Sequence, residues 1–350
     1  MLKKKIDMRL FLAIALTAII ASCEHDNTDP VGPNLFDRFG PFEYLDSLQT
    51  SSATVDFSAG ETISFTAGFN KNVPWVLTIT GQTTGAVKTI TDFSDVLSAG
   101  NSTWNGSTTE LPLFTNEMCM VVLSVPEETE FADTLMIDVT GTQSLDAGIV
   151  ACDFDTFVVN GIQLGDFEFE LTSASGRNND ITPAQGSHFF RLEGTDNEDV
   201  LPNGEPVQTN NFFVGLARIF PTANGNPDLT YFELPTTVPE QVYLNVFLNG
   251  RMSPFTRIVL GLIIDTNNSG TFDEGTDEIR SLEFDPFYSG WRIESFLGSD
   301  FGASQADLER LIGIEAALIS LNNLQPSPRE QVGFEMDYIV FTPNLPLTTE

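Results

Sequence analysis

The run Tyr243-Leu-Asn-Val-Phe-Leu-Asn249 decides the fold, because its side chains alternate between two kinds of face. Leu244 and the other even-numbered positions form an apolar face, whereas the odd-numbered positions, including Tyr243 and Asn245, mix rings with amides. Alternation of this kind is typical of a half-buried β-strand. The apolar face is predicted to join the core. The mixed face either lines a binding surface or packs inside the protein with its amides at the rim.

The same period-two pattern recurs along most of the chain. Between residues 47 and 145 short alternating runs are separated by turns rich in Gly or Asn, as in a β-sandwich. From residue 146 to residue 350 the runs are longer and more widely spaced, and one short helix is expected over 304–311, where Ser304 can serve as its cap. We therefore predict an all-β protein in which one sandwich, 47–145, is followed by a second, 146–350.

The charge of the chain limits its partners. The 350 residues include 49 acidic and 16 basic side chains, which gives a net charge of -33. Such a surface repels polyanions, so nucleic acid and anionic lipid headgroups are poor partners. Calcium and neutral polymers remain acceptable.

The first 23 residues predict export. Three lysines after Met1, an apolar run over 10–20 and the sequence Ile20-Ala-Ser-Cys23 form a signal peptide over 1–22. The ending resembles the lipobox of bacterial lipoproteins, which implies a lipid on Cys23 and membrane attachment through that lipid. The alternative is an ordinary signal peptide followed by a chance cysteine.

Residues 23–46 are polar and interrupted by proline, so they are predicted to be a tether. Their acidic residues resemble the surface-export signal of Bacteroidetes lipoproteins, which implies an outer-membrane protein facing the cell exterior. Two further cysteines, Cys119 and Cys152, either form one disulfide in an oxidising compartment or pack as two buried thiols.

Two stretches resemble known modules. The segment 75–90 followed by Trp104-Asn-Gly106 resembles the immunoglobulin-like module of flagellar hook-cap proteins. That resemblance implies an immunoglobulin-like spacer over 47–145 with Trp75 and Trp104 in its core. The segments 290–301 and 334–341 resemble the last strands of galactose-binding-like jelly rolls in carbohydrate-binding modules. That resemblance implies a jelly-roll sandwich over 146–350.

The run from Asp265 to Glu278 predicts a calcium site. Oxygen-bearing residues at positions 1, 3 and 5 of this run, a glycine at 6 and a backbone carbonyl at 7 match the first half of a calcium loop. Position 12 is Thr276, where an EF-hand has a glutamate, so the loop is expected to link strands. The predicted ligands are Asp265, Asn267, Ser269, Thr271, Asp273, Asp277 and Glu278. The alternative is a solvated acidic hairpin.

A sugar site needs aromatic faces for stacking and planar polar groups for hydroxyls. Trp291 and Tyr288 flank the turn at Gly290 and are the favoured aromatic candidates, although Trp291 matches a position that commonly packs into the sandwich. The other candidates are Tyr243, Asn245, Arg257 and Arg191. For both arginines, pairing with one of the many acids is the default interpretation.

The sequence offers little for catalysis. Its two histidines are His25 and His188, and it contains no Gly-x-Ser-x-Gly elbow, phosphate loop or dinucleotide fingerprint. We therefore predict a non-catalytic surface lipoprotein that captures polysaccharide or oligosaccharide for a neighbouring transporter or hydrolase. One alternative is an adhesive or structural lipoprotein that binds another protein, with its aromatic rings buried. The other is a glycoside hydrolase or lyase with a deep cleft and paired acids.

Overall fold

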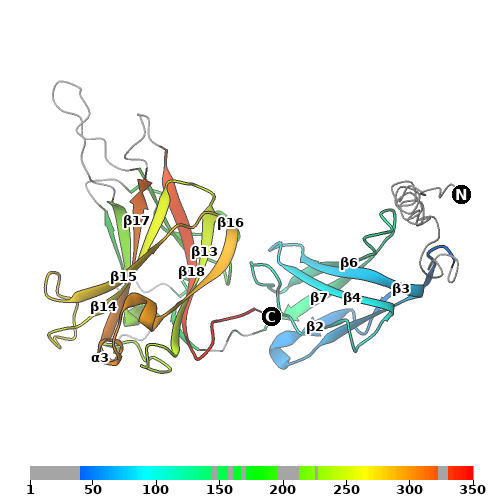
Figure 1. Ribbon diagram of the computed structural model, residues 1–350, viewed down its shortest axis with the longest axis horizontal. Helices are drawn as coiled ribbons and strands as arrows, with labels where there is room; N and C mark the ends of the chain where they lie inside the picture. Colours follow the sequence, from blue (N-terminus) through cyan, green and yellow to red (C-terminus); the bar gives the residue numbers. More distant parts are fainter. Residues whose placement is uncertain are drawn as a thin grey trace, which may run out of the picture.

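The computed structural model describes residues 40–143, 145, 148–156, 161–166, 171–195, 213–224, 228–321 and 330–349. These residues form two β-bodies that lie side by side along the longest axis of the molecule (Figure 1). The predicted all-β class is confirmed. The predicted signal peptide, Cys23 and most of the predicted tether lie outside the described residues. Within the described residues no helix has the length and apolar character needed to cross a membrane.

The first body is a seven-stranded sheet that folds around one core in the order β1-β3-β6-β7-β2, with β4 and β5 also paired to β3. The 19-residue strand β3 connects two groups of strands. Its first half pairs with β1 and β5, and its second half pairs with β4 and β6. The strands are β1 Tyr44–Thr50, β2 Thr54–Asp56, β3 Ile63–Gly81, β4 Val87–Leu97, β5 Thr103–Trp104, β6 Glu117–Ser124 and β7 Ala132–Gly141, with the 3-10 helix η1 Phe57–Ala59.

The two tryptophans of the first body lie in its core, as predicted. Trp75 and Trp104 are 0% and 1% exposed. The ring of Trp104 lies between Phe57 and Phe114, with centroid distances of 4.7 and 4.8 Å and edge-on geometry. Neither tryptophan is therefore available to a ligand.

The first body begins earlier than the sequence predicts. Strand β1 starts at Tyr44, and the ring of Phe42 lies 5.7 Å from Phe69 and 5.3 Å from Phe131. These rings bury apolar area against the core, so residues 42–46 belong to the sandwich and not to the predicted tether.

The second body is a sandwich of two sheets. The front sheet has the order β10-β11-β18-β13-β16 with β8 added beside β18, and the back sheet has the order β15-β14-β17-β12-β9. Their bounds are β8 Ile149–Cys152, β9 Ile162–Asp166, β10 Gly176–Asn178, β11 Phe189–Gly194, β12 Phe213–Ile219, β13 Val242–Arg251, β14 Thr256–Ile264, β15 Glu278–Phe284, β16 Ser289–Leu297, β17 Leu311–Ser320 and β18 Val332–Pro343, with the 3-10 helices η2 Pro221–Asn224 and η3 Gly298–Phe301.

Local sequence signals account for much of this body. The even face of β13 is buried between the sheets, with Leu244, Val246 and Leu248 at most 2% exposed. The short helix α3, Gln305–Leu308, begins after Ser304, whose side chain accepts a hydrogen bond from the Asp307 amide. One prediction is wrong: the sequence pattern of residues 154–159 predicts a strand, but the described part, 154–156, is a bend in which Phe154 has a φ of 55°.

The two cysteines are free, buried thiols. Cys119 lies in the core of the first body and Cys152 in the core of the second. The structure therefore supports the thiol alternative over the disulfide.

The outer face of the front sheet is largely covered by the chain itself. A β-bulge in β18 adds Tyr338, whose φ is 34°, between the pairs Val246–Ile339 and Phe247–Asp337. Phe247 and Tyr338 then pack with Leu347 of the C-terminal tail and with Leu111 of the first body. Hydrogen bonds from Leu113 to Ala184 and from Thr108 to Thr349, of 2.8 and 3.0 Å, connect the two bodies at this face.

Candidate functional site

A cleft at the junction of the two bodies contains Trp291. Its volume is about 540 Å³, within the range of about 300–1,000 Å³ typical of small-ligand sites. One wall comes from β16 of the front sheet and the other from a loop of the first body, with Thr349 of the tail between them. The lining residues are Thr109, Glu110, Leu111, Ser289, Gly290, Trp291, Arg292, Ile293 and Thr349.

The turn before Trp291 is built on glycine. Gly290 has a φ of 82° and lies opposite Gly250 of β13. A Cβ at Gly250 would lie 2.3 Å from the carbonyl oxygen of Tyr288, so the turn packs directly on the neighbouring strand. This close approach places Trp291 at the rim of the sheet.

Two contacts fix the Trp291 ring. Its Nε1 donates a 2.8 Å hydrogen bond to the carbonyl oxygen of Thr182, and its ring lies edge-on to Phe189 with centroids 5.9 Å apart. The side chain is half-buried, so the part that lines the cleft is held in one orientation. An aromatic surface held in this way can stack on a ligand without first becoming ordered.

The polar groups of the cleft suit hydroxyl recognition. Glu110 and Arg292 are exposed and carry opposite charges, and Thr109 and Ser289 add hydroxyls. Glu110 is the one carboxylate among the described lining residues, whereas glycoside hydrolysis requires a facing pair. The arrangement can therefore bind a polyhydroxylated ligand, but this lining lacks the paired acids of a glycosidase.

Tyr288, the other favoured aromatic residue, lies under the turn and outside the cleft. Its side chain is 9% exposed, and the guanidinium of Arg292 lies 4.4 Å from its ring centroid. The ring is thus covered by the protein's own cation.

Asn245 is fully buried and its amide is engaged within the protein. Its Nδ2 donates to the Val340 carbonyl at 3.1 Å and to Thr342 Oγ1 at 3.0 Å, and its Oδ1 accepts from Ser295 Oγ and the Leu347 amide. Tyr243 is half-buried at the other end of the β13–β16 pair, opposite Leu297, and does not line the cleft.

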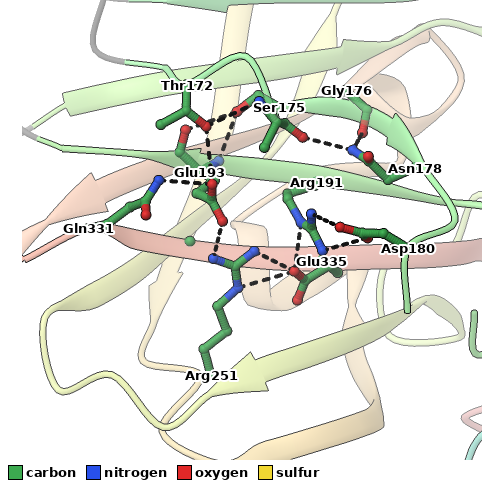
Figure 2. A network of polar contacts seen from close by, with 12 residues as sticks. Thr172, Ser175, Gly176, Asn178, Asp180, Arg191, Glu193, Arg251, Gln331 and Glu335 are labelled. Carbon is green, nitrogen blue, oxygen red and sulfur yellow. Dashed lines mark hydrogen bonds and ion pairs between the residues drawn. The ribbon is translucent and has the colours of Figure 1, made fainter. Parts of the chain in front are cut away.

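Arg191 belongs to a network of charges on the front sheet (Figure 2). Its guanidinium donates to Glu335 at 2.9 Å and to both oxygens of Asp180 at 2.8 and 2.9 Å. Arg251 also binds Glu335 and reaches Glu193 at 2.5 Å. Burial acts to lower the pKa of Arg191, but its bonds to Asp180 and Glu335 raise that pKa above the usual value, so the side chain stays charged.

Arg257 lies on the back sheet, where it pairs with Asp285 at 2.8 Å and Glu283 at 3.4 Å. The structure therefore does not bring the predicted sugar-binding residues into one site. Of the six, Trp291 alone lines the cleft at the junction.

The predicted calcium loop is held closed by its own carboxylates. Asp265 is fully buried and accepts hydrogen bonds from the Tyr231 hydroxyl and from the amides of Ser269 and Gly270. Asp277 accepts from the amides of Thr266 and Asp273. Burial acts to raise the pKa of Asp265, but these hydrogen bonds, led by that of Tyr231, hold it below the usual value.

The fit of this loop to a calcium ion is incomplete. Asn267 turns its Nδ2, and not its oxygen, toward Asp273 at 2.8 Å. Among the described residues, no three His, Cys, Asp or Glu side chains gather in a way that could hold a metal ion. Calcium at this loop stays a prediction.

Sequence reasoning missed most of the cleft. Thr109 and Glu110 come from the first body, and Thr349 comes from the tail. Their proximity to Trp291 depends on how the two bodies pack, which no local pattern in the sequence reports.

Comparisons with known proteins give weak likenesses to sugar-binding modules. No protein-family model matches the chain, and no curated protein matches it in sequence. One matching structure is a carbohydrate-binding module of promiscuous specificity from the β-sandwich superfamily, with a TM-score of 0.34 and 10% identity. The match covers 86% of this chain and 97% of that chain.

Two further matches have the same character. SGBP-B from a complex xyloglucan utilization locus in Bacteroides uniformis has a TM-score of 0.35 and 11% identity, and the match covers 87% of this chain and 73% of that chain. The family 11 carbohydrate-binding module from Clostridium thermocellum, solved with a β-1,3-1,4-mixed-linked tetrasaccharide, has a TM-score of 0.33 and 10% identity, with coverage of 57% and 96%. TM-scores this low do not decide function.

Proposed function

We propose that the protein binds neutral glycans non-catalytically in the cleft at Trp291. The observation that carries the proposal is the Trp291 ring, fixed by Thr182 and Phe189, facing a cleft of about 540 Å³ whose other polar groups are hydroxyls and one pair of opposite charges. Aromatic stacking combined with hydroxyl hydrogen bonding is the chemistry that recognises a pyranose ring.

The cellular setting in this proposal comes from the sequence. A lipid on Cys23 would attach the protein to the outer membrane, and residues 24–39 would serve as the tether. A weak grip on a long polymer at the surface would raise its local concentration for a transporter or hydrolase nearby. Calcium, if it binds, would bind at the Asp265 loop, which hydrogen bonds to Asp265 already hold in place.

Affinity electrophoresis tests the proposal. The chain from residue 23, with Cys23→Ser, is run through gels containing neutral polysaccharides, including mixed-linkage β-glucan, xylan and xyloglucan, with calcium and again with chelator. We expect retardation by at least one polymer, and we expect Trp291→Ala to abolish it. Phe93→Ala, which removes a ring that is 61% exposed on β4 of the first body, is the matched control and should leave retardation unchanged. The proposal fails if no polymer retards the protein or if Trp291→Ala is retarded like the parent.

A second candidate function, binding of another protein, is favoured by a separate observation. Met118, Met120 and Met136 are each more than a third exposed on the first body, and Met120 lies directly opposite Met136 across the β6–β7 pair. Exposed methionines adapt to varied apolar surfaces. If no polymer retards the folded protein in the gels, this candidate is favoured.

A further inference from the structure

A second cavity lies in the second body, beside the Asp265 loop. It has a volume of about 420 Å³ and lies between the first residues of β9, the end of β12, residues 228–230 and residues 270–272. The residues that line it include Gln163, Phe220, Thr230, Thr271 and Phe272. None of these residues was among the predicted sugar contacts.

The walls of this cavity are fixed before any ligand arrives. The Tyr231 hydroxyl, next to one wall, donates a 2.7 Å hydrogen bond to Asp265, which also accepts from the amide of Gly270 in the other wall at 2.9 Å. A Cβ at Gly270 would lie 3.3 Å from the methyl group of Thr230, so the two walls meet closely at this point. Asp265 is therefore a positioning residue that gives the cavity its shape, and a preformed cavity lowers the entropic cost of binding.

One side of the cavity is aromatic. The rings of Phe220 and Phe272 have centroids 6.4 Å apart, and the guanidinium of Arg218 lies 4.6 Å from the Phe272 centroid. Arg218 is itself paired with Glu315 at 2.8 Å and with Glu274 at 3.6 Å. The cation thus anchors the Phe272 ring, while its charge is matched within the protein.

The remaining groups indicate the class of ligand. Thr230, Thr271 and Gln163 offer hydroxyl and amide groups that can donate and accept hydrogen bonds. Asp228 is the one charged side chain among the described lining residues, and the whole chain carries a net charge of -33. An anionic ligand would be repelled here, whereas a neutral ligand with hydroxyls and an apolar ring face fits.

We propose that this cavity is a second glycan subsite, which binds a neutral sugar unit against Phe220 and Phe272 independently of the cleft at Trp291. The inference rests on the proposed function for its class of ligand. Two separate contacts with one polymer strengthen overall binding through effective concentration, beyond what either site provides alone.

The test uses the Cys23→Ser protein with Trp291→Ala as background, so that the cleft is silenced. Binding of cellobiose, xylobiose, lactose and the anionic digalacturonate is measured by saturation-transfer NMR and titration. We expect at least one neutral disaccharide to bind the background protein and digalacturonate not to bind. Phe272→Ala should weaken that binding at least tenfold, and Gln163→Ala, which changes an exposed residue outside the loop, should also weaken it. The matched control is Phe287→Ala, which removes a ring that is 58% exposed outside the cavity and should leave the dissociation constant unchanged.

The inference is overturned if no neutral disaccharide binds the background protein, or if Phe272→Ala and Gln163→Ala both leave the dissociation constant unchanged. These outcomes are separate from failure of the cleft. The cleft proposal depends on whether Trp291→Ala abolishes retention by polymer. Binding of disaccharides to the cavity is measured in proteins that already lack Trp291.

Discussion

Arginine, glutamate and aromatic side chains occur together at two places, on the front sheet and where that sheet meets the first body. In the charged network, Arg191 and Arg251 donate to Glu335, which is 2% exposed, and each side chain is satisfied by a neighbour in the protein. At the Trp291 cleft, an arginine and a glutamate again lie close to an aromatic ring, but both are exposed. Residue type alone therefore does not mark a binding group. What matters is whether its hydrogen-bonding capacity is already used inside the fold.

The largest expected effect comes from breaking the charged network. Glu335→Ala removes the shared partner of Arg191 and Arg251. It leaves Arg191 with Asp180 alone and Arg251 with Glu193 alone, beside the site of a carboxylate that is 2% exposed. We expect a loss of about 3–5 kcal/mol in the free energy of unfolding, measured by urea denaturation. Glu283→Ala, in an exposed pair with Arg257, is the control and should cost less than about 1 kcal/mol. Equal losses in the two variants would contradict the comparison.

The second largest loss of stability is expected from removing the buried amide of Asn245. Asn245→Ala removes the partner of Ser295 and of the Leu347 amide and leaves the Thr342 hydroxyl with the Leu345 carbonyl alone. We expect it to cost about 2–3 kcal/mol of unfolding free energy. Asn249→Ala, on the same face of the same strand but half-buried, should cost clearly less. If Asn245→Ala were neutral for stability and instead weakened polymer retention, its assignment as a structural residue would be wrong.

Asp337 should make the free energy of unfolding depend on pH. Burial raises the pKa of Asp337 well above its usual value of 3.8, although its oxygens accept hydrogen bonds from the amides of Gln185 and Tyr338. The folded protein therefore keeps this proton to a higher pH than the unfolded chain does. The contribution of Asp337 to stability is unchanged below the unfolded pKa and falls as pH rises through the folded pKa.

The measurement compares unfolding free energies of the parent and Asp337→Asn at several values between about pH 4 and about pH 8. The parent should lose stability relative to the variant as pH rises. Asp180→Asn should show the opposite slope when the series is extended below about pH 4. The hydrogen bond from Arg191 lowers the pKa of Asp180, so its contribution to stability is lost as pH falls through that lowered pKa. Parallel curves for the parent and Asp337→Asn would refute the assignment.

The smallest effect is expected on the back sheet. Arg257 pairs with Asp285 and Glu283 while its side chain stays 34% exposed, so solvent screens the pairs. Arg257→Ala should change the unfolding free energy by less than about 1 kcal/mol. It should also leave retention by polymer unchanged, and a loss of retention would return Arg257 to the list of sugar contacts.

Local patterns predicted what local physics determines. The alternation in β13 correctly placed Leu244, Val246 and Leu248 in the core, and Ser304 correctly marked the start of a helix. The core positions of Trp75 and Trp104, which the resemblance of 75–90 and 104–106 to an immunoglobulin-like module implies, are also confirmed. In each case the decisive neighbours lie close in sequence, or the preference is simply for burial.

The site depended on distant contacts and was only partly predictable. Asn245 is engaged by the amide of Leu347, 102 positions away, and Arg191 by Glu335, 144 positions away, so neither can be judged available to a ligand from its sequence neighbours. The walls of the Trp291 cleft come from both bodies and the tail. The strand that the pattern of 154–159 predicts is interrupted at Phe154, whose positive φ no local sequence pattern signals.

Each body contains one buried thiol whose alkylation can report when that body unfolds locally. Cys119 and Cys152 lie in different cores, and burial, as the largest cause, raises the pKa of each thiol to about 12. Both should therefore resist alkylation until the surrounding sandwich opens. In a Cys23→Ser protein that keeps one thiol at a time, the labelling rate would show which body opens first and whether the contacts at their junction make them open together.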